Sequence, residues 1–283
     1  MTRKGEWPPA PEALPSPVAD NHCHLEWPVG DEPRSVERQL ADAAQVGVDR
    51  VVQIGCDIAS ARWTASAVEE YPAMLGGVAI HPNEAPAHSA GEHATGLSYE
   101  DAFAEIAALA RGERIRVIGE TGLDYFRTGP EGHEAQVRSF RDHIALAKEL
   151  NKPLQIHDRD AHGDVIDVLE RDGAPEMTVF HCFSGDAGMA RLCADRGYYL
   201  SFAGTVTFKN SHGLRAALSV TPLSRVLVET DAPFLTPHPY RGAPNSPYLI
   251  PVTMQTIADV TGVTLETACE SVSDTSNSLY GPW

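Results

Sequence analysis

The sequence predicts a single-domain α/β fold, a (β/α)8 TIM barrel preceded by a disordered N-terminal tail. The length of 283 residues suits one barrel-type domain. Eight short apolar segments recur along the chain, and helix-like segments lie between them. Several of the apolar segments carry apolar residues on both faces, which is typical of parallel strands covered by helices.

The strand-like segments favour a barrel over a doubly wound open sheet. An open sheet would not need eight strands, and no G-x-G-x-x-G motif follows the first strand. The expected strands span residues 16–22, 48–56, 73–81, 114–120, 152–157, 177–181, 197–204 and 225–230.

The clearest helix is expected over residues 136–150, where Val137, Phe140 and Ile144 lie on one stripe of 3.6-residue period. Asn151, with a proline two residues later, ends this pattern. Further helices are expected over residues 34–45, 60–71, 98–112, 163–173, 248–261 and 264–273.

The sequence predicts two regions, an N-terminal tail and one barrel domain. Residues 1–17 contain five prolines and no apolar core, so they predict a stiff, disordered tail rather than a secretory signal. Residues 18–283 form the barrel, and residues 85–98 are a polar loop within it. No internal repeat and no second domain are expected.

The composition excludes several classes of protein. The chain is 42% hydrophobic without an apolar run long enough to span a membrane. Its five cysteines form no C-x-x-C pair, which argues against disulfides and cysteine zinc sites and fits a reducing cytoplasm. The net charge of -17 argues against sequence-independent coating of DNA, but an enzyme can still contact a polyanion through metal ions. We expect a cytoplasmic monomer.

The segment ADNHCHLEW places His22 and His24 two residues apart near the end of the first expected strand. Side chains at positions i and i+2 of a strand point to the same side, so both imidazoles can bind one metal ion. An H-x-H pair also occurs by chance, so the other strand ends decide its meaning.

Further ionisable residues follow the other strands, at the face where barrel enzymes build their active sites. They are His81, Glu120, Asp124, His157, His181, Glu229 and Asp231. Four histidines with Glu120 and Asp231 are too many ligands for one open catalytic site. They suit two divalent ions about 3.5–4 Å apart, which activate a bridging water for hydrolysis. Mg, Mn and Zn all remain open as the metal.

Four of the strand-end residues have more specific expected roles. Asp231 is expected to be both a ligand and the general base. Glu229 either orients a ligand or is a buried acid, and Asp124 either orients a ligand or caps the next segment. His81 ligates a metal, contacts a phosphate or is structural, and we carry the phosphate contact forward.

The chain resembles the TatD family of metal-dependent deoxyribonucleases, within the amidohydrolase-like barrels. The matching stretches, in order, are DNHCHL, AIHPNEA, IGETGLDYFR, QIHDRDA, FHCFSG, FAGTVTFKN, VETDAPFLTP, YRGAPNSP and TSNSLYG. They cover almost everything from residue 18 onward. Asn21 and Ser246 depart from the family's usual residues, which leaves the substrate preference open but not the reaction type.

The resemblance implies a ligand set and an activity. One ion would be held by His22, His24, Glu120 and Asp231, and a second by Glu120, His157 and His181. It also implies exonuclease action on DNA, for which we expect 3′ ends of single strands as the substrate and Asp231 and Glu120 as catalytic residues. Expected phosphate contacts are His81, Arg159, Lys209 and Arg241, of which the two arginines lie inside matching stretches.

Two other classes of function stay open. A barrel hydrolase for amides, lactones or other esters would also use an activated water, but related barrels often bridge their metals with a modified lysine where this chain has Glu120. A non-catalytic metal protein or binding scaffold would suit a saturated ligand set without nearby cations, which does not match the arginines and lysine at the strand ends.

Overall fold

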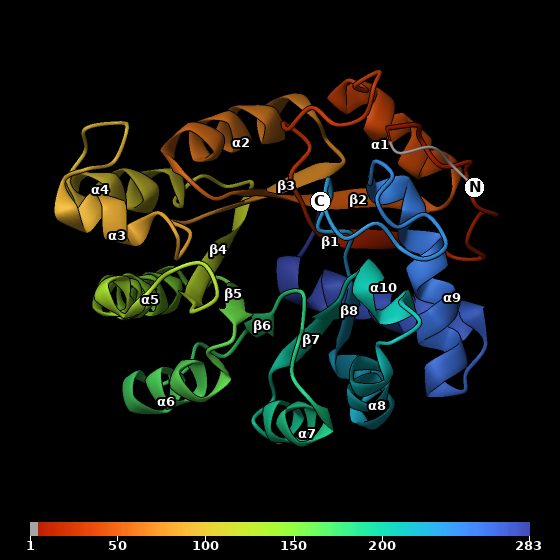
Figure 1. Cartoon of the computed structure of the whole chain (residues 1–283). Coiled ribbons are helices and arrows are strands. Elements are labelled where there is room, and N and C mark those ends of the chain that lie inside the picture. The colour runs from red at the N-terminus through yellow and green to blue at the C-terminus, as the bar shows by residue number, and fades with distance from the viewer. Residues whose placement is uncertain (1–4) are drawn as a thin grey trace. The chain divides into compact units, whose positions relative to one another are not determined.

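The computed structural model describes residues 5–283, and within them eight strands form one sheet whose order follows the chain (Figure 1). The pairs β1–β2, β3–β4, β4–β5, β5–β6 and β7–β8 are parallel. The strands are β1 (Val18–Cys23), β2 (Val48–Gly55), β3 (Met74–Val78), β4 (Ile115–Asp124), β5 (Leu154–Arg159), β6 (Thr178–Phe180), β7 (Tyr199–Phe202) and β8 (Val226–Val228). All eight predicted strands are therefore confirmed.

The first and last strands of the sheet lie beside each other. A parallel bridge joins Cys23, the last residue of β1, to Ala232. The N–H of His24 donates to the carbonyl of Ala232 at 2.7 Å. The sheet therefore closes on itself as a (β/α)8 barrel, which confirms the predicted fold.

Ten α-helices lie within residues 5–283. They are α1 (Val36–Gln45), α2 (Ile58–Glu70), α3 (Ala85–Ala90), α4 (Tyr99–Leu109), α5 (Pro130–Leu150), α6 (His162–Asp172), α7 (Ala187–Asp195), α8 (His212–Val220), α9 (Ile250–Thr261) and α10 (Leu265–Tyr280). In the described part of the chain, none combines the length and apolarity needed to cross a bilayer.

Three helices were not predicted. The helix α3 occupies the first part of the expected polar loop, so that prediction is wrong over Ala85–Ala90. It forms because Ala85 and His88 are buried while α3 packs on α5. The helices α7 and α8 are each nine residues long, and their stability comes from packing on each other rather than from a long sequence pattern.

The chain divides into two compact units, with residues 1–53 and 185–283 in unit 1 and residues 54–184 in unit 2. In unit 1, α7 packs on α8, α8 on α9 and α9 on α10, while α10 covers β1 and β8. Leu227 of β8 and Val272 of α10 are fully buried in this packing. The strand ends of unit 1 are thus held by an apolar interior.

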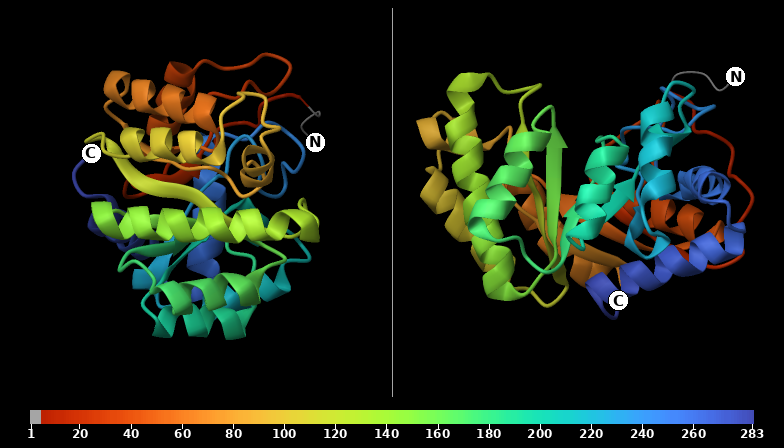
Figure 2. Two further views of the ribbon diagram at one scale, coloured as in Figure 1. Left: turned by 90° about the vertical axis from the view of Figure 1, so that its left-hand side faces the viewer. Right: turned by 90° about the horizontal axis from the view of Figure 1, so that it is seen from below.

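Unit 2 carries α2, α4, α5 and α6, which lie side by side in the left view of Figure 2. The Tyr99 hydroxyl of α4 donates to the Asp142 carboxylate of α5 at 2.8 Å. Ile106 and Phe140 are fully buried beneath these helices. The strand β4 runs to Asp124, so it extends beyond the predicted end at residue 120.

The expected disordered tail is corrected by its contacts. Residues 5–17 pack on unit 1, because Leu14 is buried and the Tyr248 hydroxyl donates to the carbonyl of Pro8 at 2.7 Å. The apolar rings in this segment therefore find partners among residues far along the chain. Residues 1–4 lie outside the described residues.

His143 of α5 predicts an acid-sensitive step in stability. Its Nε2 accepts the N–H of Ile80 at 3.1 Å, and its Nδ1 lies 2.7 Å from the carbonyl of Ser139. Burial lowers the pKa of His143 to about 4. The unfolded chain binds this proton near pH 6.5, so the stabilisation is complete above that pH and is lost as the pH falls toward 4.

We expect about 3 kcal/mol of unfolding free energy to be lost across this range through His143. Urea unfolding between pH 4 and pH 7 measures it. His143→Gln should flatten the dependence, while His212→Gln, at an exposed position, controls for the loss of an imidazole. Equal pH slopes in wild type and His143→Gln would contradict the prediction.

Candidate active site

A first cluster of metal-type ligands lies in unit 1, where β1 ends beside the segment after β8. The Nε2 atoms of His22 and His24 are 3.2 Å apart. Oδ1 of Asp231 lies 3.8 Å from Nε2 of His22 and 3.5 Å from Nε2 of His24. Ligand nitrogens at about 2.0–2.1 Å from a tetrahedral ion lie about 3.3 Å from one another. The three atoms therefore have the spacing of ligands to a single divalent ion.

Asp20 ties the two segments of this cluster together. Its buried carboxylate accepts hydrogen bonds from the N–H and the hydroxyl of Thr230, at 2.9 and 2.5 Å, and from the N–H of His22 at 3.2 Å. Burial raises the pKa of Asp20 to about 7, although the bonds from Thr230 act in the opposite direction. The N–H of Asp231 also donates to the carbonyl of His22 at 2.9 Å, so the Asp231 backbone is held at His22.

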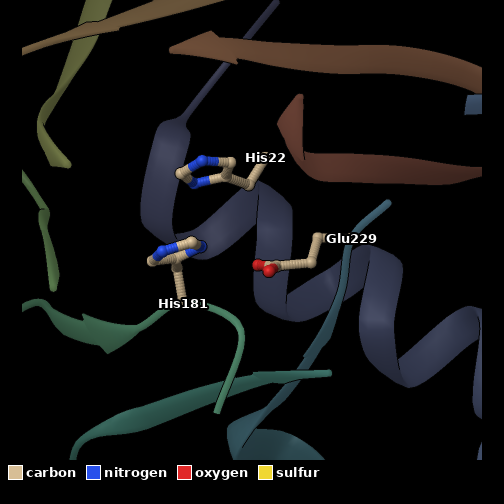
Figure 3. Close-up of side chains that lie close together, drawn as sticks. All are labelled: His22, His181 and Glu229. Atoms are coloured by element: carbon tan, nitrogen blue, oxygen red, sulfur yellow. The ribbon is translucent and has the colours of Figure 1, made fainter. Parts of the chain in front are cut away.

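Glu229 provides a further buried acid in unit 1. Its side chain is fully buried one residue after β8. Figure 3 shows its carboxylate and the ring of His22 extending into the same space. His181, also labelled there, follows β6 in unit 2. An acid beside a histidine suits the predicted role of orienting a ligand, which stays a prediction.

A second cluster lies in unit 2 around the carboxylate of Glu120, which is 4% exposed. Oε2 of Glu120 lies 2.7 Å from Nε2 of His181 and 2.9 Å from Nδ1 of His157. The two histidine nitrogens are 3.5 Å apart. These donors come from β4, β5 and the residue after β6, and their spacing also suits one divalent ion.

Asp124 orients His157 from the other side of its ring. Nε2 of His157 lies 3.2 Å from Oδ2 of Asp124, which also accepts from the Asn83 amide at 3.1 Å. Oδ1 of Asp124 accepts the N–H of Arg127 at 2.8 Å. A carboxylate that binds the far nitrogen of a histidine fixes the tautomer in which the near nitrogen can bind a metal. These contacts suit both predicted roles of Asp124, orienting a ligand and capping the next segment, and both stay predictions.

His81 follows β3, and its hydrogen bonds favour donation over ligation. Its Nδ1 accepts the N–H of Asn83 at 3.1 Å. Burial lowers the pKa of His81 to about 3, so the ring is neutral and carries its proton on Nε2. That nitrogen lies 3.7 Å from Oε2 of Glu120. It can therefore donate to an anionic oxygen, as expected for a phosphate contact.

In the second cluster, the neighbouring histidines favour the ionised form of the buried Glu120 carboxylate. Burial would raise the pKa of Glu120, but the charge interaction with His181 and the hydrogen bonds from His157 and His181 hold that pKa well below its usual range. Burial would lower the pKa of His157, yet its bonds to Asp124 and Glu120 raise it. A divalent cation supplies the same compensation without protonated histidines.

The three cations predicted to contact phosphates are all exposed. The guanidinium of Arg159 lies 3.9 Å from the ring centre of Phe126 in unit 2. In unit 1, the guanidinium of Arg241 lies 4.7 Å from the ring centre of Phe208, which directly precedes Lys209. Stacking leaves the edge of a guanidinium available to phosphate oxygens.

Sequence reasoning missed three residues of these clusters. Asp20 and Asn83 both lie inside the matching stretches, but only their hydrogen bonds reveal a role. The Cys56 thiol contacts Oε1 of Glu120 at 3.3 Å, whereas it was expected to be a plain buried residue. Its position at the end of β2 was the signal available in the sequence.

A family model described as TatD related DNase matches residues 19–281. The chain belongs to the TatD family. It is 39% identical over 269 residues to the uncharacterized metal-dependent hydrolase TatD of Mycobacterium tuberculosis, covering 93% of this chain and 98% of that protein. It is 35% identical to the uncharacterized metal-dependent hydrolase YabD of Bacillus subtilis, covering 92% of this chain and 98% of that protein.

The solved structures agree with this membership. The crystal structure of YJJV, a TatD homolog from Escherichia coli K12, has a TM-score of 0.83 at 24% identity and covers 93% of this chain and 97% of that one. This likeness shows the fold. The family match and the curated relatives make the chain a metal-dependent hydrolase of the TatD family, and the structure supplies candidate His, Glu and Asp ligands.

Replacement of Asp20 should destabilise the first cluster. Asp20→Ala leaves three buried donors without this acceptor, so we expect a loss of about 2–4 kcal/mol in unfolding free energy. Asp20→Asn should lose much less, because its amide oxygen can still accept from both backbone N–H groups. Urea unfolding of the metal-free protein measures both losses. Asp195→Ala, at an exposed position on α7, is the control. Equal losses for Ala and Asn would show that the hydrogen bonds do not carry the effect.

Proposed function

We propose that this TatD family member is a 3′–5′ exodeoxyribonuclease that hydrolyses phosphodiester bonds with two divalent ions. The observation that carries the proposal is that each unit independently brings three metal-type ligand atoms within 3.8 Å of one another. The family model's description as a DNase supports DNA as the substrate. Single-stranded 3′ ends are the proposed form of that substrate.

The residues fit the proposed ions by donor chemistry. His22, His24 and Asp231 would hold one ion, and Glu120, His157 and His181 would hold the other. Imidazole and carboxylate ligands suit zinc and manganese, and carboxylates also suit magnesium. When bound, the ions supply Lewis acidity that makes water a stronger nucleophile and stabilises charge on a phosphate. That Glu120 also ligates the first ion stays a prediction.

The chain's own groups would then handle protons and charge. Asp231, with a side chain 15% exposed, keeps access to water and is the proposed general base. His81 would donate from Nε2 to a phosphate oxygen. Arg159, Lys209 and Arg241 would neutralise neighbouring phosphates, which matters in a chain of net charge -17.

The alternative is hydrolysis of amides, lactones or other esters. One structural neighbour is a β-aspartyl dipeptidase from Fervidobacterium islandicum, at 13% identity and a TM-score of 0.61. That likeness concerns the fold alone. The exposed arginines stacked on aromatic rings favour a phosphodiester over a neutral amide, so the nuclease is the leading proposal.

Metal content tests the ligand assignment. Wild type should bind two divalent ions per chain, measured by elemental analysis after dialysis. His24→Ala and His157→Ala should each lose one ion, because each removes a ligand from a single cluster. Glu120→Ala should lose both ions, as expected if the Glu120 carboxylate binds both of them. His212→Ala, at an exposed position outside both clusters, should keep two. Retention of both ions in Glu120→Ala would contradict the bridging role.

Kinetics on single-stranded DNA test the activity. Chelator should abolish release of mononucleotides, and Asp231→Asn should lower kcat by about 10²–10⁴ through loss of the general base. Arg159→Ala and Arg241→Ala should mainly raise KM and flatten its salt dependence. Arg62→Ala, which breaks a surface pair with Glu105, is the matched control.

Two outcomes would count against these roles. Intact DNA beside rapid hydrolysis of lactones or amides would transfer the proposal to the alternative substrate class. Arginine variants with a lower kcat and an unchanged KM would show that these side chains act on the reaction step rather than on substrate binding.

A further inference from the structure

Aromatic side chains continue outward from the first cluster in unit 1. The ring of Trp27 stacks on that of His24, with centres 4.7 Å apart and planes within 16°. Phe234 meets Trp27 edge to face at 5.6 Å. Phe234 is 50% exposed, which is unusual for a large apolar ring held by ordered neighbours. An exposed aromatic surface thus begins at a proposed metal ligand.

A cavity adjoins this surface. Its volume is about 760 Å³, and its lining includes Phe234, Phe208, Asp31 and Arg241. This size lies in the range of sites that hold small organic groups. The guanidinium of Arg241 covers the Phe208 ring and remains exposed, so the cavity combines flat apolar faces with a positive charge.

The backbone holds Phe234 at a fixed offset from the proposed general base. The N–H of Phe234 donates to the carbonyl of Asp231 at 2.8 Å. The side-chain amide of Asn245 donates to the carbonyls of Phe234 and Thr230, the latter at 3.0 Å. A group stacked on Phe234 would therefore keep a constant distance from Asp231.

We propose that Phe234, with Trp27 and the adjoining cavity, is the subsite for the base of the 3′-terminal nucleotide. The inference rests on the proposed nuclease function and adds the residue that recognises an unpaired base. Every nucleobase offers a flat π-face, so stacking on aromatic rings binds single strands with little dependence on sequence. Arg241 would contact the phosphate that joins this nucleotide to the rest of the strand.

The stacked geometry also predicts a preference for unpaired ends. A terminal base that enters the cavity beside Phe234 must leave its complementary base, so a paired end must first open. An aliphatic or peptide partner would not need both a flat ring and a guanidinium at one edge of the cavity. A nucleobase with its phosphate uses both.

The test compares two oligodeoxynucleotides that differ only in whether the 3′-terminal sugar carries thymine or is abasic. Wild type should have a lower KM for the thymine end. Phe234→Ala should raise that KM about 5- to 100-fold, as expected for loss of one base–aromatic stack, and leave the abasic KM unchanged. Phe234→Tyr should restore the preference. Leu192→Ala, at an exposed apolar residue of α7, is the control.

Binding of the same oligonucleotides in chelator, followed by fluorescence anisotropy, separates this proposal from the nuclease itself. Hydrolysis without any difference between the two ends overturns the base subsite and leaves the nuclease standing. Base-dependent binding that Phe234→Ala abolishes, without hydrolysis under any divalent metal, supports the subsite and overturns the nuclease. Neither hydrolysis nor base-dependent binding overturns both.

Discussion

Both clusters at the strand ends are built around buried carboxylates, whose charge must be compensated by neighbouring groups. An ionised carboxylate in an apolar interior is costly unless donors or cations surround it. Glu120 is 4% exposed and has nitrogens of three histidines within 3.7 Å, while fully buried Asp20 accepts three hydrogen bonds. The hydrogen bonds and ion pairs therefore stabilise each buried acid and also keep its partner side chains in place. The apolar strands position the backbone from which these hydrogen-bonded acids and their partners extend.

Because every member is tied to another, hydrogen bonds within the protein hold the side chains of both clusters in place. Asp124 sets the ring of His157, the N–H of Asn83 sets the tautomer of His81, and the Asp20–Thr230 pair holds the segment that carries Asp231. Preorganised groups lose little freedom when substrate or metal binds, which is the usual physical basis of an efficient site. The same contacts distinguish the proposed donor from the proposed ligand, since Nδ1 of His81 already accepts the N–H of Asn83, while Nδ1 of His157 faces Glu120.

The net negative charge of the chain gives the proposed phosphate contacts Arg159 and Arg241 a larger part in binding. A chain of net charge -17 attracts a polyanion only weakly, so contact with DNA would depend on individual cationic and aromatic side chains. Arg159 and Arg241 both stack on phenylalanine rings, which holds their guanidinium groups in place. Aromatic and cationic groups side by side match a nucleotide, whose base is flat and whose phosphate is charged. Recognition by stacking would also explain why such a protein needs no basic surface.

The eight strands and most helices could be predicted from the sequence, as could the His, Glu and Asp residues at the strand ends, because apolar periodicity and strand-end position are local properties of a chain. The sequence did not determine that residues 5–17 are ordered or that α3, α7 and α8 form, since their stability comes from packing partners elsewhere. Nor could it assign Asp20, whose partner Thr230 lies 210 residues away. The proton position on His81 is different, because it is set locally by the N–H of Asn83, only two residues further along the chain. Contacts between distant residues, and the burial that makes them necessary, exist only in the tertiary structure.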